Sequence, residues 1–212
     1  MFGIHQLEEV AYVPGEHEVL SYSIFSEKEY HDVLMLKNKN SINDKYNLLL
    51  ERILKILGDR EKWVNFLLPK TEESIAICHN DLNNLNIMNT AKEAFLIDYD
   101  YVGFNFIAYD IANLINETSF DYTPKTYPGF KILKTYEAEH IDEMVKHYPG
   151  YYPELGDEVL RFMCVSNLYW AIWSLKRFEF NVSEIFGILE HGLKRMDLFD
   201  QYNKLIEKKE AL

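Results

Sequence analysis

Apolar side chains recur along most of this chain at spacings that predict helices. From Asp44 to Leu57 they follow the period of an amphipathic helix, and Gly58 ends the run. Ser26 with Glu29 has the pattern of a capping box, so a helix is expected to begin there. Further helices are predicted in the second half of the chain, over 106–116, 138–148 and 153–177 and from Ser183 to about Glu207. Most of the chain is therefore predicted to be helical.

The predicted strands are short and few. Leu7 to Val13 is apolar and rich in strand-forming residues, and Pro14-Gly15 marks a turn after it. Ser74 to Cys78 has the character of a short buried strand. Ile87-Met88 and Ala94 to Ile97 predict a hairpin around a polar turn. A small amount of strand followed by a run of helices predicts the α+β class.

Composition and charge narrow the classes of function. With 212 residues, 48% of them apolar, the chain can form one substantial domain or a large lobe with a small one. The formal net charge is −12, whereas nucleic-acid-binding proteins typically carry a basic patch, so no nucleic-acid partner is expected. No apolar run reaches membrane-spanning length and the first residues do not resemble a signal peptide, so we expect no membrane insertion and a cytoplasmic location. Cys78 ends an apolar strand and is expected to be a buried free thiol.

The strongest functional signal lies between the strand ending at Cys78 and the hairpin. Asp81 and Asn86 follow His79 as His-x-Asp-x-x-x-x-Asn, and Asp98 ends the second hairpin strand. Kinase-type phosphoryl transfer needs this set: Asp81 as catalytic base at the attacking hydroxyl, and Asn86 and Asp98 as oxygen ligands of Mg²⁺ at the ATP phosphates. Asn and Asp are also common in surface loops, which is the alternative. The strands on both sides favour the phosphotransferase site.

Other polar side chains are predicted to support this motif. His79 is expected to hold the loop through hydrogen bonds and not to react. Asp100 either supports the metal ligands or faces solvent. Asp110, Asn113 and Glu117 share one face of a helix. That stripe is either the solvent-exposed side of the helix or, as we favour for Asp110, an anchor for the catalytic loop.

Trp170 and Trp173 are three residues apart and therefore lie on one face of a predicted helix. Paired tryptophans in an apolar helix usually pack in the core. The alternative is an aromatic wall around a cation, because ring faces attract ammonium groups.

Taken together, these motifs resemble the choline/ethanolamine kinase family, and its eukaryotic-type members more than its bacterial ones. The resemblance runs from roughly Leu7 to the C-terminus. Its first motif is shared by many kinase-like enzymes, including aminoglycoside phosphotransferases, whereas the full combination is much more specific. The residues that carry it are His79-Asn80-Asp81-Leu82 with Asn86, Ile97-Asp98-Tyr99-Asp100-Tyr101, Tyr109-Asp110-Ile111-Ala112-Asn113, Asn116-Glu117 with Phe120-Asp121-Tyr122, and Trp170-Ala171-Ile172-Trp173-Ser174.

The resemblance implies a protein-kinase-like fold that transfers the γ-phosphate of ATP to the hydroxyl of ethanolamine or choline, the first step of phosphatidylethanolamine or phosphatidylcholine synthesis. It implies that residues 1–15 are a remnant of the N-terminal lobe and hinge, with Ala11 and Val13 at the nucleotide, and that residues 16–212 form the helical C-terminal lobe. It also implies a possible homodimer. The amine-binding residues that it implies are Asn83, Glu117, Tyr122, Trp170, Trp173 and Phe186.

Three departures from the family pattern qualify these expectations. The family usually has Gln at the position of Asn83, and a family aromatic falls at His191, which tilts the expected substrate slightly toward ethanolamine. In the family a Gly-rich phosphate loop and a strand lysine precede the hinge, whereas the first lysine here is Lys28. The chain is therefore expected to be a fragment, a catalytically impaired or inactive amine- or nucleotide-binding member, or an enzyme with a compensating arrangement. An aminoglycoside-type phosphotransferase is a further alternative.

Overall fold

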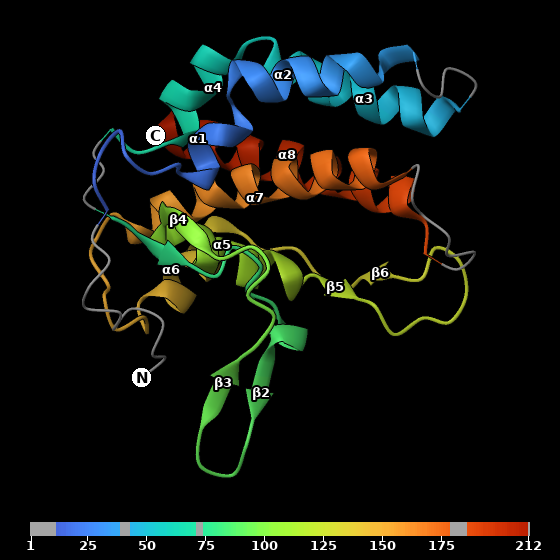
Figure 1. Cartoon of the computed structure of the whole chain (residues 1–212). Helices are drawn as coiled ribbons and strands as arrows, with labels where there is room; N and C mark the ends of the chain where they lie inside the picture. The colour runs from blue at the N-terminus through green and yellow to red at the C-terminus, as the bar shows by residue number, and fades with distance from the viewer. Residues whose placement is uncertain (1–11, 39–42, 71–73, 179–185, 212) are drawn as a thin grey trace.

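Two long antiparallel helices form the centre of the structure, a computed structural model that describes residues 12–38, 43–70, 74–178 and 186–211. They are α7 (Leu155–Arg177) and α8 (Ile188–Glu210), which lie side by side (Figure 1). α7 is buried on nearly every side because it is largely apolar around its circumference. It therefore serves as the core helix against which the other elements pack.

Helices cover α7 from both sides (Figure 1). On one side lie α3 (Asp44–Leu57), which also contacts α8, and α4 (Arg60–Leu67), while α2 (Glu27–Leu34) packs on α3 and leads into the 3₁₀ turn η2 (Met35–Asn38). On the other side lie α5 (Ile107–Glu117) and α6 (Ala138–Val145). The short α1 (Leu20–Ile24) contacts a strand that precedes α5.

The described strands form antiparallel pairs. β1 (Ile75–Cys78) pairs with β4 (Gly103–Phe106), with Cys78 opposite Gly103. β2 (Ile87–Asn89) and β3 (Ala94–Leu96) form a hairpin that projects from the helical body (Figure 1). The 3₁₀ turn η3 (Asn84–Asn86) precedes it, and β5 (Phe120–Asp121) pairs with β6 (Lys131–Ile132). The predicted catalytic motif, from His79 to Asn86, therefore lies between β1 and the hairpin.

Most of the predicted elements are present. The bounds of α3 are as predicted, and Ser26 caps α2 by accepting a hydrogen bond from the Glu29 backbone N–H at 3.0 Å. A turn follows Val13, where Gly15 has a φ of +81° that glycine adopts without steric cost. Residues 7–11 of the first predicted strand and the predicted cap Ser183 lie outside the described residues. Cys78 is free and fully buried, as predicted.

Sequence reasoning missed the elements that local pattern does not specify. β4 contains Gly103 and Asn105, both poor strand formers, and is a strand because β1 pairs with it. α1, α4 and the β5–β6 pair were also not predicted. No helix in the described ranges combines the length and the apolar character that crossing a bilayer requires.

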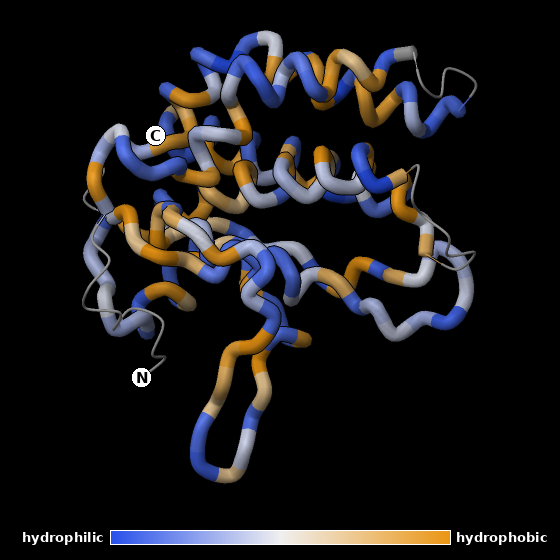
Figure 2. Tube along the Cα trace, viewed as in Figure 1, coloured by the Kyte–Doolittle hydropathy of each residue, from blue (hydrophilic) through white to orange (hydrophobic). Residues whose placement is uncertain are grey.

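Apolar stretches line the interior of the helical body and recur in the hairpin (Figure 2). In the hairpin Met88 and Phe95 face each other across the strands, yet about half of each side chain is exposed.

Close packing at Gly192 yields a test of the α3–α7–α8 contact. A Cβ at Gly192 would lie 2.6 Å from Cδ2 of Leu49 and 2.9 Å from Cβ of Ser174. We expect Gly192→Ala to lower the free energy of unfolding in urea by about 1–3 kcal/mol through overpacking, although alanine favours helix. Lys204→Ala, on the exposed side of α8, should change it by less than about 0.5 kcal/mol. A Gly192→Ala variant as stable as the wild type would contradict this packing.

Candidate active site

Two residues of the predicted motif have the left-handed backbone conformation. Asn80 has a φ of +63° and Asp98 a φ of +64°. Asn and Asp tolerate this region better than other non-glycine residues, but it still carries strain that the surroundings must hold in place. The backbone is therefore held in a strained, left-handed conformation at two points of the candidate site, Asn80 and Asp98.

Asp110 on α5 supplies the main restraint on the loop after β1. Its buried carboxylate accepts the backbone N–H of His79 at 2.7 Å and that of Asn80 at 2.8 Å. Hydrogen bonds to a charged acceptor are among the stronger ones in proteins. Asp110 thus ties the strained turn to the helix that follows β4.

Asn105, in the middle of β4, connects the same turn to α1. Its Oδ1 accepts the Ser21 hydroxyl at 2.6 Å, and its Nδ2 donates to Oδ1 of Asn80 at 2.9 Å. Asn80 in turn donates to the backbone carbonyl of Tyr101 at 2.9 Å. Every one of these polar contacts is buried or half-buried, which makes them costly to break.

The Asp81 carboxylate is held by two amides of its own loop. Its Oδ1 accepts from Nδ2 of Asn83 and its Oδ2 from Nδ2 of Asn86, at 3.1 and 3.0 Å. Burial raises the pKa of Asp81 above its ordinary value, the hydrogen bond from Asn83 opposes that rise, and the negative charge of Glu117 adds to it. The oxygen of Asn83 accepts from the Leu85 backbone N–H at 2.8 Å, so both ends of this amide make contacts within the loop.

His79 links the loop to the hairpin. Its Nε2 lies 2.9 Å from the carbonyl of Ile97, and its Nδ1 accepts the Asp81 backbone N–H at 3.3 Å. A carbonyl can only accept, so the proton of the neutral ring is on Nε2. His79 therefore joins Asp81 to the residue immediately before Asp98.

The two predicted metal ligands lie at the same end of the hairpin. The carbonyl of Asn86 accepts the Ile97 backbone N–H at 3.0 Å, which brings Asn86 opposite the residue before Asp98. Nδ2 of Asn86 points to Asp81, so its oxygen lies on the other side of the amide. Asp98 and Asp100 are exposed.

This donor set fits a metal that arrives with a nucleotide. Within the described ranges, no three His, Cys, Asp or Glu side chains converge into a metal site of their own. Mg²⁺ at nucleotide sites typically takes only one or two protein side chains, because phosphates and waters complete its coordination, and kinase-type sites use one Asp and one Asn.

Apart from Asn83, whose contacts lie within the Asp81 loop, the predicted amine-site residues form two groups. In the first group the ring centroids of Trp170 and Trp173 lie 5.7 Å apart, with an angle of 68° between the ring planes. The indole N–H of Trp170 donates to Oδ1 of Asn113 at 2.8 Å, and that of Trp173 donates to the hydroxyl of Tyr101 at 3.0 Å. Asn113 donates to the carbonyl of Leu82 at 3.1 Å. The first group is therefore connected directly to the loop that carries Asp81.

In the second group Glu117, Tyr122 and Phe186 lie around His191 and Arg195. Glu117 is only 8% exposed and forms an ion pair with Arg195, and it accepts the Tyr122 hydroxyl at 3.2 Å. The ring centroid of Phe186 lies 6.4 Å from that of Tyr122 and 5.6 Å from that of His191.

The polar stripe on α5 is therefore not a solvent-exposed face. Asp110, Asn113 and Glu117 are all buried, whereas the apolar Ile111 and Leu114 on the same helix are only half-buried. That alternative was wrong because α7, α8 and the catalytic loop supply polar partners for the stripe.

Three residues of the site were not predicted from the sequence. Tyr101 stood within the Asp98 motif and could have been singled out as an aromatic next to the metal segment. Asn105 gave no signal beyond a polar residue in an apolar segment. Arg195 gave none, because arginine on a helix is usually exposed.

The expected nucleotide contacts are only partly within the described structure. Ala11 lies outside it. Val13 is 39% exposed, and its backbone N–H donates to Nδ1 of His17 at 3.2 Å.

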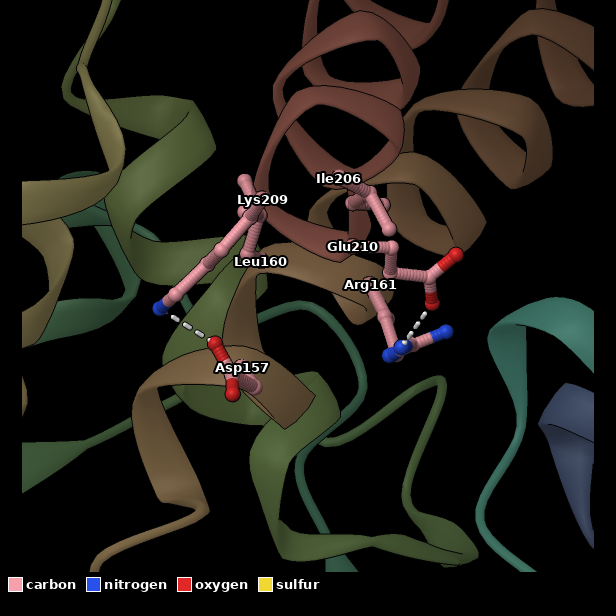
Figure 3. A pocket seen from close by; sticks show the side chains of 6 residues that line it. All are labelled: Asp157, Leu160, Arg161, Ile206, Lys209 and Glu210. Carbon is pink, nitrogen blue, oxygen red and sulfur yellow. Dashed lines mark hydrogen bonds and ion pairs between the residues drawn. The ribbon is translucent and has the colours of Figure 1, made fainter. Parts of the chain in front are cut away.

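A pocket elsewhere contains none of the predicted residues. It lies at the opposite end of α7 and α8 from His191 and Arg195, and ion pairs join its walls (Figure 3). Its lining consists of Asp157, Leu160, Arg161, Ile206, Lys209 and Glu210.

The two hydrogen bonds to Asp110 lead to a stability prediction. In Asp110→Asn one acceptor becomes an NH₂ group that opposes a backbone N–H, so the free energy of unfolding should fall by about 2 kcal/mol. Asp100→Asn, the same change on an exposed side chain, should leave it unchanged. Urea unfolding followed by circular dichroism measures both, and equal stabilities would refute the anchoring role of Asp110.

Comparison with known proteins agrees with the motifs. Residues 5–200 match the family model described as choline/ethanolamine kinase. Ethanolamine kinase 1 of Homo sapiens is 29% identical over 164 residues, which cover 71% of this chain and 35% of that protein. Probable choline kinase 2 of Arabidopsis thaliana is 35% identical over 150 residues, 62% of this chain and 39% of that protein. The chain spans less than half the length of these relatives.

Solved structures share the fold. A choline kinase from Cryptosporidium parvum superposes with a TM-score of 0.72 at 20% identity, covering 100% of this chain and 63% of that one. An ethanolamine kinase from Plasmodium vivax superposes with a TM-score of 0.67 at 24% identity, covering 94% of this chain and 57% of that one. The predicted α+β, protein-kinase-like fold is thereby confirmed. The motifs, the fold and the family match agree that this chain belongs to the choline/ethanolamine kinase family.

Proposed function

We propose that this chain carries the acceptor site of a kinase that transfers the γ-phosphate of ATP to the hydroxyl of a small amino alcohol, ethanolamine or choline. The observation that carries the proposal is that hydrogen bonds hold the Asp81 carboxylate and also connect the adjacent residue, Leu82, to Trp170. Asn83 and Asn86 hold the carboxylate, and Asn113 connects Leu82 of the same loop to Trp170. A proton acceptor and a cation-binding aromatic surface thus share one rigid support.

In this proposal Asp81 accepts or orients the proton of the substrate hydroxyl. The amides of Asn83 and Asn86 keep its two oxygens in fixed directions, which reduces the reorganisation that the reaction requires. Asn86 and Asp98 would hold Mg²⁺, which when bound neutralises the charge on the phosphates. His79, Asp110 and Asn113 act as structural supports, and the exposed Asp100 is assigned the same role.

The amine end of the substrate is assigned to the two aromatic groups. The ring faces of Trp170 and Trp173 would attract an ammonium group, and Glu117 and Tyr122 of the second group would supply oxygen acceptors. Ethanolamine is the preferred substrate in this proposal because its three N–H groups can use such acceptors, which the methylated nitrogen of choline cannot. A cytoplasmic location and a homodimer complete the proposal.

The activity is tested by following ADP release with ethanolamine and with choline. Asp81→Ala should lower kcat about 10²- to 10⁴-fold, because a general base typically contributes that much. Asp157→Ala, at the far end of α7, is the matched control and should retain full activity. Amine binding by calorimetry without turnover would instead identify a binding member of the family. No heat with either amine would refute the amine site.

The environment of Asp81 predicts a pH effect. An ionised carboxylate is needed to accept the proton, so kcat/KM should fall as the pH drops through the raised pKa of Asp81. Asn83→Ala removes a hydrogen bond that lowers this pKa, so the acidic limb of the profile should move to higher pH. Asn89→Ala, an exposed change in the hairpin, should leave the profile in place. An unshifted or downward-shifted limb in Asn83→Ala would argue against Asp81 as the base.

A further inference from the structure

Arg195 on α8 is among the largest fully buried side chains in the described residues, with 1% exposed. Its guanidinium donates to partners on three parts of the chain: the Glu117 carboxylate, the Tyr122 hydroxyl at 3.1 Å and Nε2 of His191 at 3.2 Å. It also lies over the ring of Phe120, 4.1 Å from the centroid. These contacts pair the buried cation through Nε and Nη2, whereas Nη1 has no hydrogen-bond partner among the described residues.

The hydrogen bonds around His191, including the one from Arg195, determine which ring nitrogen carries its proton. Ser174 donates its single hydroxyl proton to the Trp170 carbonyl at 2.8 Å, so its oxygen accepts from Nδ1 of His191 at 2.9 Å. The proton of His191 is therefore on Nδ1, and Nε2 is an acceptor for Nε of Arg195. Burial, with the positive charge of Arg195, holds the pKa of His191 well below its usual value, so the ring is neutral.

The same logic orients Tyr122. Its hydroxyl oxygen accepts from Nη2 of Arg195, which also donates to Oε1 of Glu117. Nε2 of His191 lies 3.3 Å from the same hydroxyl, but its one lone pair accepts from Nε of Arg195. The Tyr122 proton is therefore directed to Oε2 of Glu117 at 3.2 Å. Arg195 therefore sets the direction of both polar groups that the proposed function assigns to the amine. Through His191 and Ser174 it is also tied to the backbone of Trp170.

We propose that Arg195 is a positioning residue for the amine substrate, acting through Glu117 and Tyr122. This inference rests on the proposed function. Lysine in its place could still pair with Glu117, but a compact ammonium cannot reach Tyr122 and His191 at the same time as a planar guanidinium does. The role of Arg195 therefore depends on the shape of its side chain as well as its charge.

Steady-state kinetics of Arg195→Lys test the proposal. We expect the KM for the amine to rise roughly 10- to 100-fold, the effect of losing a charge-assisted hydrogen bond, with little change in kcat or in the KM for ATP. Arg161→Lys is the matched control, because Arg161 also pairs with a carboxylate, Glu210, but at the far end of the helices. An amine KM in Arg195→Lys no higher than in Arg161→Lys would overturn the proposal.

A double-mutant cycle tests whether Arg195 acts through Tyr122. Tyr122→Phe removes the hydroxyl that Arg195 orients, and it should also raise the amine KM. If the two residues act as a unit, Arg195→Lys with Tyr122→Phe should be no worse than the more severe single variant. Fully additive effects would overturn the proposal.

A third test uses the wild-type protein, so its result depends neither on the folding of a variant nor on enzyme activity. The ¹⁵N spectrum of His191 should show a neutral ring with a proton on Nδ1 and none on Nε2. A protonated Nε2 would overturn the proposal, because Arg195 could not then donate to it. Absence of amine turnover and binding in the wild type, with the expected spectrum, would refute the proposed function and with it the role assigned to Arg195.

Discussion

The candidate site depends on one buried carboxylate that accepts two consecutive backbone N–H groups. Asp110 holds His79 and Asn80 at the point where the chain leaves β1 with a positive φ. Without that acceptor the turn would bury two unpaired donors as well as backbone strain. The position of Asp81, one residue later, follows from this restraint. The predicted catalytic loop is thus supported by the body of the helical domain and not by its own sequence alone.

Buried polar contacts also carry the connection from the catalytic loop to the aromatic residues. Asn113 joins Leu82 to Trp170, and Ser174 joins Trp170 to His191. Such contacts are directional, so they fix orientation in a way that apolar packing around α7 does not. In a chain with a net charge of −12, the cation of Arg195 is placed where it neutralises a buried carboxylate. The two groups of predicted amine residues are consequently parts of one network.

Much of the fold could be predicted from local pattern because the elements concerned are specified locally. The apolar period of α3 and the capping hydroxyl of Ser26 determine those helices within a few residues of sequence. β4 could not be predicted, since a strand containing Gly103 and Asn105 is stabilised by β1, which lies far away in sequence. For the same reason the burial of Arg195 was missed: its partners Glu117 and Tyr122 come from distant segments.

The sequence by itself determined the family, the α+β class and the residues of the motif, because residue identity and spacing along the chain suffice for these. Only the tertiary structure decided that the side-chain amide of Asn83 forms its hydrogen bonds within its own loop. The same is true of the burial of the polar face of α5 and of the ion pair between Arg195 and Glu117. The physical reason is that hydrogen-bond and ion-pair partners are chosen by proximity in space. Helical spacing in the sequence predicts which side chains share a face. Only the packing of the helix determines whether that face contacts water, a loop or an opposite charge.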